Sequence, residues 1–280
     1  MRTLLSMLSA AVLVSCAEHR VSQVAGPGGA LAVDDGGAEP ASRLPAVFVH
    51  SLAGNASHWA AQLEHLRRNH RAVALDLRGH GRSERPRDGD YTLTAMAGDV
   101  AAVVDSLGLD QFVLVGHSMG GGVALLYAGA HPERVAGLVL VDPIGDGKQI
   151  STAEAKAFLA GFESDYQGTS ARYWAGIAGP DSAIRERLLA DLRATPRAAV
   201  VQVLGEVLRF DPDPALARYQ GPTLAIVTPS NDMPFSLHRL GKGFPHHVVQ
   251  GTGHWIQLDK PEVFNRLLDE FLEKSVNSEQ

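Results

Sequence analysis

Residues 116–120 read Gly-His-Ser-Met-Gly, which places Ser118 between two glycines that lie two residues away on either side. An apolar run at 112–115 precedes this segment, and small and apolar residues suited to a helix follow it at 123–130. A sharp turn from a strand into a helix strains the backbone of its serine and requires very small neighbours. The pattern therefore predicts a serine hydroxyl raised on a tight turn, an arrangement suited to nucleophilic catalysis.

The other reactive residues give little support for metal or redox chemistry. Cys16 is the one cysteine of the chain, so no disulfide, cysteine zinc site or iron–sulfur site can form within it. The 12 histidines include His246 and His247, which are adjacent and would point to opposite faces of a strand, so they cannot bind one ion together. No H-E-x-x-H segment is present. We therefore expect neither a metal nor any other cofactor.

Strands and helices alternate on both sides of Ser118. Short apolar runs typical of buried strands occur at residues 46–50, 72–77, 112–115, 138–141, 224–227 and 248–250. Apolar residues at helical spacing occur at residues 59–66, 93–107, 123–130 and 263–272. This alternation predicts an α/β fold with a mostly parallel central sheet and helices on both faces.

The alternation stops between residues 144 and 221, where the spacing of apolar residues is helical throughout. Ser151 and Glu154 have the spacing of a capping box at the start of one of these helices. We expect an all-helical insertion over residues 144–221 that covers the site as a lid. The core of the fold would then consist of residues 17–143 and 222–280.

The first residues of the chain have the features of an export signal. Arg2 supplies a positive charge, and the apolar stretch that follows is too short to span a bilayer. The sequence Leu-Val-Ser-Cys at residues 13–16 resembles the bacterial lipobox, in which the cysteine is lipidated and becomes the first residue of the mature protein. We therefore expect residues 1–16 to be a signal and Cys16 to anchor an exported protein to a membrane of the cell envelope. The alternative is a plain cleaved signal and a periplasmic or secreted protein.

Composition and charge narrow the class of partner. The chain is 45% hydrophobic and 20% charged, which is typical of a folded globular protein. Its formal net charge is −6, from 25 basic and 31 acidic residues, with no long run of either sign. A nucleic acid partner would call for a basic surface, so we expect a small-molecule substrate instead.

Four further segments give the sequence a family resemblance. They read HSLAG at residues 50–54, DLRGHGRS at 76–83, PTLAIV at 222–227 and GTGHW at 251–255. Together with residues 116–120, and in this order, they resemble the α/β-hydrolase fold superfamily over about residues 20–275. The resemblance implies that fold and a hydrolytic activity.

The resemblance also implies roles for individual residues. Ser118 would be the nucleophile and His254 the base that takes its proton. The backbone N–H groups of Leu52 and Met119 would stabilise the oxyanion of the tetrahedral intermediate. Ser51 stands where the family usually has a glycine, so the loop that carries Leu52 departs from the family pattern.

Two carboxylates compete for the third catalytic position, the acid that orients the histidine. Asp232 follows the expected strand at 224–227 and gives the family's chain order of serine, acid and histidine, so we prefer it. A simple alignment, however, would place Asn231 there. Asp142, at the end of the expected strand at 138–141, is the alternative acid.

The expected function is that of a serine hydrolase that cleaves an ester or related acyl bond through an acyl-enzyme intermediate. A serine at position 118, in place of an aspartate, argues against epoxide hydrolase and haloalkane dehalogenase chemistry. Hydrolysis of a carbon–carbon bond in a diketone, lactone hydrolysis and cofactor-free perhydrolysis are alternatives on the same three residues. The alternative outside enzymes is a non-catalytic ligand-binding protein, which would have no need of Ser118, Asp232 and His254 together.

Overall fold

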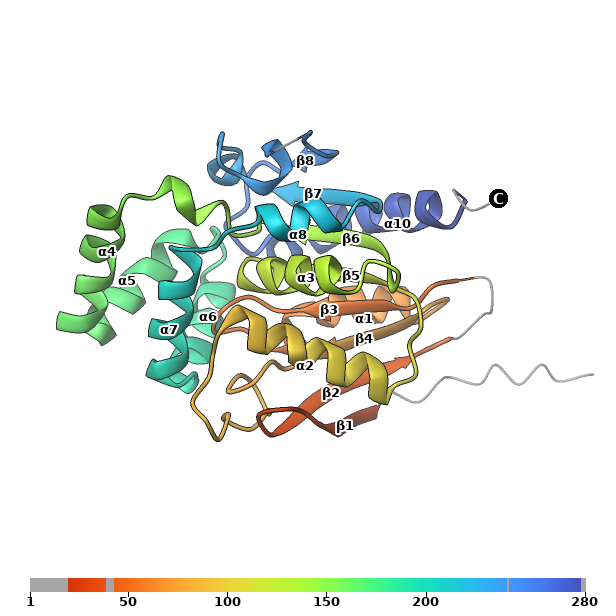
Figure 1. Ribbon diagram of the computed structural model, residues 1–280, viewed down its shortest axis with the longest axis horizontal. Coiled ribbons are helices and arrows are strands. Elements are labelled where there is room, and N and C mark those ends of the chain that lie inside the picture. The colour runs from red at the N-terminus through yellow and green to blue at the C-terminus, as the bar shows by residue number, and fades with distance from the viewer. Residues whose placement is uncertain (1–19, 39–42, 241, 278–280) are drawn as a thin grey trace, which may run out of the picture.

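The computed structural model describes residues 20–38, 43–240 and 242–277. The expected signal and its Cys16 lie outside the described residues. Within them, eight strands form one sheet in the order β1-β2-β4-β3-β5-β6-β7-β8 (Figure 1). The strands are β1 (Arg20–Ala25), β2 (Ala30–Gly37), β3 (Ala46–Val49), β4 (Arg71–Leu75), β5 (Phe112–His117), β6 (Val135–Val141), β7 (Thr223–Val227) and β8 (His246–Val248).

The direction of the strands decides where the functional residues gather. The pairs β1–β2 and β2–β4 are antiparallel, and every pair from β4 to β8 is parallel. The carboxyl ends of the parallel strands therefore share one edge of the sheet, where ligands bind in folds of this kind. His50, Ser118 and Asp142 each follow one of these strands directly, so they reach that edge together. The predicted α/β fold with a mostly parallel sheet is confirmed.

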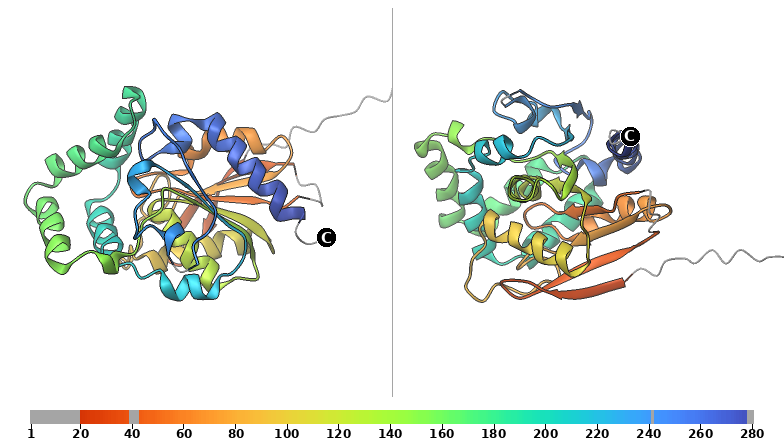
Figure 2. Two further views of the ribbon diagram at one scale, coloured as in Figure 1. Left: turned by 90° about the horizontal axis from the view of Figure 1, so that it is seen from above. Right: turned by 45° about the vertical axis from the view of Figure 1, so that its right-hand side comes forward.

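Helices cover both faces of the sheet (Figure 2). One face carries α2 (Leu93–Ser106) and α3 (Met119–Ala130), and the other carries α1 (Ala60–Leu66), α9 (Ile256–Asp259) and α10 (Pro261–Asn277). Alternate residues of a strand point to opposite faces. In β3, Val47 faces the α2 and α3 side, whereas Phe48 packs against Trp59 on the α1 and α10 side. Both cores therefore grow from the same buried strands.

The stretch between β6 and β7 is helical. It forms α4 (Thr152–Ser164), α5 (Tyr166–Ile177), α6 (Ser182–Ala194), α7 (Arg197–Val207) and α8 (Asp213–Arg218). The expected capping box is present, because the Ser151 hydroxyl bonds the N–H of Glu154 and the Glu154 carboxylate bonds that of Ser151. Helices α4 to α7, called here the lid helices, lie together at one end of the sheet (Figure 1).

We expected the whole helical insertion to cover the site, but the position of helix α8 differs from this expectation. It packs against α3 of the core instead (Figure 1). The contact is close, because a Cβ atom on Gly129 would come within 2.7 Å of the Ala215 Cα atom. The last part of the insertion therefore packs on α3 and does not line the cavity of the site.

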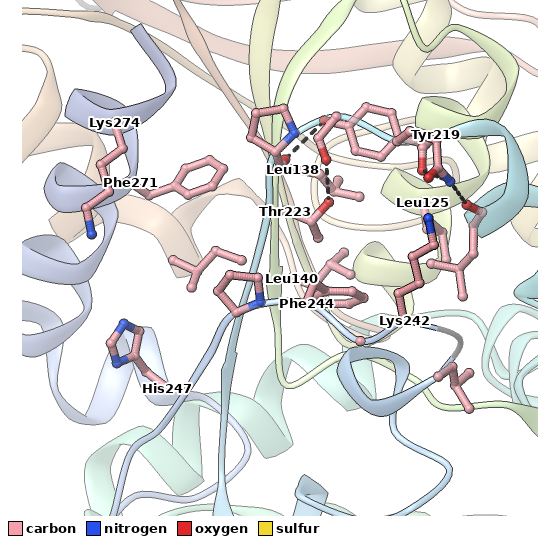
Figure 3. A pocket seen from close by; sticks show the side chains of 18 of the residues that line it. Leu125, Leu138, Leu140, Tyr219, Thr223, Lys242, Phe244, His247, Phe271 and Lys274 are labelled. Atoms are coloured by element: carbon pink, nitrogen blue, oxygen red, sulfur yellow. Dashed lines mark hydrogen bonds between the residues drawn. The ribbon is translucent and has the colours of Figure 1, made fainter. Parts of the chain in front are cut away.

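The described residues of the connection from β7 to β8 form two short 3₁₀ turns, Pro229–Asn231 and Leu237–Arg239, and no α-helix. Beside it lies a groove of about 840 Å³, lined by side chains that include Leu138, Phe244 and Phe271 (Figure 3). Candidate catalytic residues do not line this groove, although it is larger than the cavity that they share.

None of the described helices is both long enough and apolar enough to cross a membrane.

Candidate active site

Ser118 lies on a strained turn between β5 and α3. Its backbone has φ 53° and ψ −117°, a left-handed conformation that is costly for a residue with a side chain. The two flanking glycines are required by contact: a Cβ on Gly116 would lie 2.3 Å from the carbonyl oxygen of Gly120. A Cβ on Gly120 would lie 2.4 Å from the carbonyl oxygen of His50. The predicted tight turn is therefore present, and only glycine fits at positions 116 and 120, two residues before and two residues after the serine.

Backbone hydrogen bonds hold this turn in place. The N–H of Ser118 donates to the carbonyl of Val141 at 2.9 Å, and the Ser118 carbonyl accepts from the N–H of Gly121 at 2.9 Å. Met119 is the first residue of α3, so its N–H has no partner within the helix. A helix N-terminus with such an N–H favours negative charge nearby.

His254 is oriented by a carboxylate at one ring nitrogen. Its Nδ1 lies 2.6 Å from the Oδ2 of Asp142, and the Asp142 side chain is 3% exposed. The backbone N–H of His254 donates to the carbonyl of Ile177, the last residue of α5, at 2.9 Å. Both the ring and the main chain of His254 are therefore fixed.

Asp142 has hydrogen-bond donors at both carboxylate oxygens. Its Oδ1 accepts from the backbone N–H of Thr228 at 2.7 Å and from the Thr228 hydroxyl at 2.9 Å. Its own N–H donates to the carbonyl of Ile226 at 2.8 Å, and its φ of 39° turns the chain sharply at the end of β6. These donors hold the Asp142 carboxylate in a fixed position against His254. Thr228, directly after β7, is a contributor that the sequence analysis did not identify.

The structure corrects the expectation for the acid, because Asp232 does not contact His254. Its Oδ1 accepts from His238 Nε2 at 2.9 Å and from Arg239 Nε at 2.6 Å. These two hydrogen bonds, with that of His238 the larger influence, lower the pKa of Asp232. The 3₁₀ turn after β7 carries Asp232 past the strand end, and Asn231 lines the cavity instead, with its Nδ2 bonded to the carbonyl of Pro143 at 2.9 Å. The acid against His254 is Asp142, the alternative.

The loop after β3 is fixed by a neutral histidine. His50 accepts the N–H of Leu77 at Nε2 at 3.0 Å, so its proton is on Nδ1, which donates to the carbonyl of Ser51 at 2.7 Å. Burial lowers the pKa of His50 to about 3, which keeps the ring neutral. The Ser51 side chain fits because it is buried under Trp255, whose Nε1–H donates to the Ser51 hydroxyl at 3.2 Å. The serine that departs from the family pattern is therefore accommodated by a hydrogen bond.

His117, the residue before the candidate nucleophile, supports the main chain of the candidate base. Its Nε2 donates to the His254 carbonyl at 2.8 Å, and its Nδ1 accepts from the Gln257 amide at 3.2 Å. Its ring lies 4.7 Å from that of His254, centroid to centroid, and full burial lowers the pKa of His117 well below the usual value. The only signal for this role in the sequence was its place within residues 116–120.

A cavity of about 350 Å³ brings the candidate residues together. Its wall on the core side includes Ser118, Met119, Leu52, Asp142 and His254. Its wall on the lid side consists of Tyr173, Trp174 and Ile177 from α5 and Leu204 and Val207 from α7. The structure therefore brings five of the residues singled out in the sequence to one cavity, beneath two of the lid helices, and leaves Asp232 outside it.

Comparisons with known proteins agree with this fold. A family model described as alpha/beta hydrolase fold matches residues 45–176. The chain is 30% identical over 253 residues to an sn-1-specific diacylglycerol lipase of Mus musculus, a match that covers 82% of this chain and 81% of the lipase. Among solved structures, an N-acyl homoserine lactone degrading enzyme is similar, with 27% identity, a TM-score of 0.77 and coverage of 89% of this chain and 100% of the other.

A third relative is much longer than this chain. The match to the dihydrolipoyllysine-residue acetyltransferase component of the acetoin cleaving system of Cupriavidus necator is 40% identical but covers 41% of this chain and 30% of that protein. The similarity to the mouse lipase, by contrast, extends over most of both proteins. On that evidence, and with the fold described above, the chain belongs to the α/β hydrolase fold family of enzymes.

Proposed function

We propose that this protein hydrolyses esters of small molecules through an acyl-enzyme intermediate on Ser118. The observation that carries the proposal is the shared cavity: Ser118 lines it on a strained turn, and His254 lines it with Nδ1 2.6 Å from Asp142. A serine, a histidine and an acid in this relation are the parts of a nucleophilic triad.

The hydrogen bond to Asp142 sets the role of the imidazole. Because Nδ1 carries the proton shared with the carboxylate, Nε2 is the basic nitrogen of His254. In the first step the Ser118 oxygen forms a bond to the ester carbonyl carbon, and the hydroxyl proton moves to His254 Nε2. Asp142 then faces a positively charged ring, which its negative charge stabilises.

The carbonyl oxygen of the substrate becomes an oxyanion in this step. The N–H of Met119, at the start of α3, and the N–H of Leu52 are the groups proposed to receive it. Collapse of the intermediate breaks the bond to the alcohol, which leaves with the proton from His254. A water molecule then gives a proton to His254 and forms a bond to the acyl carbon of the acyl-enzyme. The bond from that carbon to the Ser118 oxygen breaks, the carboxylic acid is released, and Ser118 regains its proton from His254.

The size and walls of the cavity indicate the kind of ester. About 350 Å³ lies at the lower end of the range for small-molecule sites, and the lid side contributes mainly aromatic and aliphatic side chains. Esters with short to medium apolar acyl or alcohol groups fit this description. The similar mouse protein is named as a lipase of diacylglycerol, whose bonds are esters.

Lactone hydrolysis is the second candidate. A lactone is a cyclic ester that the same residues would open by the same steps, and a structure similar to this one belongs to a lactone degrading enzyme. Carbon–carbon bond hydrolysis and perhydrolysis use the same three residues, so these alternatives differ from ester hydrolysis in the substrate that the cavity admits.

The deciding experiment measures kcat/KM for p-nitrophenyl esters of rising acyl length beside a series of lactones and a diketone. We expect the highest values among the esters, and Ser118→Ala should abolish both turnover and labelling by a fluorophosphonate probe while the melting temperature stays unchanged. Labelling of the folded Ser118→Ala protein would remove Ser118 as the nucleophile. A wild-type protein that binds these compounds without turning them over would favour the ligand-binding alternative.

Export and lipid anchoring also belong to the proposal. They rest on the sequence Leu-Val-Ser-Cys at residues 13–16 after a positive and then apolar start. Acyl chains on Cys16 would hold the enzyme at a membrane surface, since each buried methylene contributes about 0.8 kcal/mol.

A further inference from the structure

Three ligating side chains meet in the connection between β7 and β8. They are Asp232, after the first 3₁₀ turn, His238, in the second, and His246, the first residue of β8. One carboxylate oxygen and one nitrogen of each histidine all lie within 4.8 Å of one another. The three residues come from separate segments, so it is the fold that brings them together.

His238 is the centre of this cluster. Its side chain is fully buried, its Nε2 lies 2.9 Å from Asp232 Oδ1, and its ring centroid lies 4.4 Å from that of His246. Its Nδ1 is buried and has no hydrogen-bond partner among the described residues. Because Nε2 faces Asp232, it is the nitrogen of His238 that can share an ion with that carboxylate, while Nδ1 lies on the opposite side of the ring.

We propose that Asp232, His238 and His246 bind a divalent transition-metal ion, with Zn²⁺ as the best match. Two imidazoles and one carboxylate form a zinc donor set, and a water molecule would complete four-coordination. Ligand atoms about 2.1 Å from zinc lie about 3.4 Å apart in a tetrahedron, so His238 Nε2 and Asp232 Oδ1, now 2.9 Å apart, would separate slightly and any pair near the 4.8 Å limit would move closer on binding. The sequence excluded a site formed by His246 with His247, and the structure replaces His247 with the distant His238.

Arg239 is the competitor for this site. Its guanidinium bonds the same Asp232 oxygen that the metal would take, with Nε at 2.6 Å. The Arg239 side chain is 43% exposed, so it can turn into solvent when the ion binds. The metal would thus replace one cation with another beside Asp232. Removal of Arg239 should therefore tighten metal binding, which a purely structural role for the cluster does not predict.

The ion would join the connection after β7 to an otherwise weakly held strand. β8 has three residues and pairs only with β7 among the described strands. Asp232 lies near the start of the connection, His238 in its middle and His246 at its end, so a bound ion would join the two ends of this connection. The cluster does not line the cavity of Ser118, so binding can be measured without reference to catalysis.

The test uses the full protein, stripped with a chelator and titrated with Zn²⁺ alone in a calorimeter, with the melting temperature as a second readout. We expect one ion per chain and a rise in melting temperature of a few degrees at saturation. His246→Ala and Asp232→Asn should each weaken binding by about a hundredfold, whereas Arg239→Ala should strengthen it. These three positions are at or near the surface, so the test does not depend on a variant at the buried His238.

His247→Ala is the matched control. His247 is the neighbour of His246 on the same strand but lines the groove of Figure 3, on the other side. It should bind Zn²⁺ as the wild type does. Equal binding by wild type, His246→Ala and Asp232→Asn would show adventitious ions only and would overturn the proposal. An equal loss in His247→Ala would overturn it as well.

Discussion

Asp142 bridges two parts of the site, because one of its oxygens receives Thr228 and the other faces His254. Asp142→Asn keeps an oxygen for Thr228 but presents an N–H₂ group to His254 Nδ1. The imidazole must then carry its proton on Nε2, where it cannot accept the proton of Ser118. We predict a fall in kcat of about 10⁴-fold, the size of effect known for the corresponding change in a serine protease triad.

The matched variant is Asp232→Asn, measured on the same short ester. Asp232 bonds His238 and Arg239, away from the cavity, so its kcat should stay within about twofold of wild type. Melting temperatures report whether each variant folds. A well-folded Asp142→Asn protein with full activity, beside an inactive Asp232→Asn, would return the role of acid to Asp232.

The sequence identifies Ser118 and His254 because their neighbours are diagnostic, but it does not distinguish the two acids. Both acids follow the ends of neighbouring strands, and a single 3₁₀ turn decides which one faces His254. Local spacing does not reveal whether such a turn carries a side chain toward the cavity or past it. Thr228 and Gln257 were missed for a related reason, since their partners are distant in the chain.

At the scale of elements, the lid helices set the shape of the cavity. Trp174 of α5 is 3% exposed, lines the cavity and has a buried Nε1–H without a partner among the described residues. Trp174→Ala should enlarge the cavity and shift the preference across the ester series toward longer acyl chains by about tenfold in relative kcat/KM.

Leu188→Ala in α6 is the control for that change. Leu188 is 1% exposed, yet it does not line the cavity. Its truncation should lower the free energy of unfolding by about 2–5 kcal/mol and leave the profile of ester preference unchanged. If instead Trp174→Ala lowers stability and leaves the profile flat, Trp174 belongs to the packing of the lid and not to substrate selection.

Helical spacing predicted that the stretch between β6 and β7 is helical but not where each helix lies. An amphipathic pattern shows that one face of a helix is buried, and it is silent on what covers that face. Helix α8 accordingly packs on α3 through Ala215 and Gly129, although it follows the lid helices directly in the chain. The strands were easier to predict, since apolar runs such as that of β5 are buried on both faces.

For the molecule as a whole, buried neutral histidines predict sensitivity to acid. Burial lowers the pKa of both His50 and His80 from 6.5 to about 3. The unfolded chain therefore takes up protons below pH 6.5 that the folded protein refuses until about pH 3. The stability that depends on these neutral rings is full above pH 6.5 and is lost as the pH falls toward 3.

Urea unfolding at a series of pH values measures this loss. Each of the two histidines should remove about 1.4 kcal/mol of unfolding free energy per pH unit between those limits. His80→Asn should reduce the slope of unfolding free energy against pH by about 1.4 kcal/mol per pH unit. The loss of stability at each lower pH is measured relative to the stability of the same protein at pH 7.5. An identical slope in the variant would show that other groups govern the acid sensitivity.

The proposed anchor is also tested on the whole molecule. Expressed in a bacterium with its own first residues, the protein should partition into the detergent phase, and Cys16→Ser should release it or stall its processing. The reason is that the acyl chains on Cys16 supply the membrane affinity. A wild-type protein that stays in the aqueous phase, with a mature N-terminus beyond Cys16, would instead show a plain secretory signal.

The bond between the His254 N–H and the Ile177 carbonyl ties the catalytic base to the end of α5. The contact around it is backbone against backbone, because a Cβ on Gly253 would lie 2.1 Å from the nitrogen of Gly179. A swing of α5 away from the core must break this bond and release the loop that carries the base. An open lid would therefore leave His254 out of position for catalysis. Closure of α5 over the substrate and positioning of the imidazole would be one and the same movement.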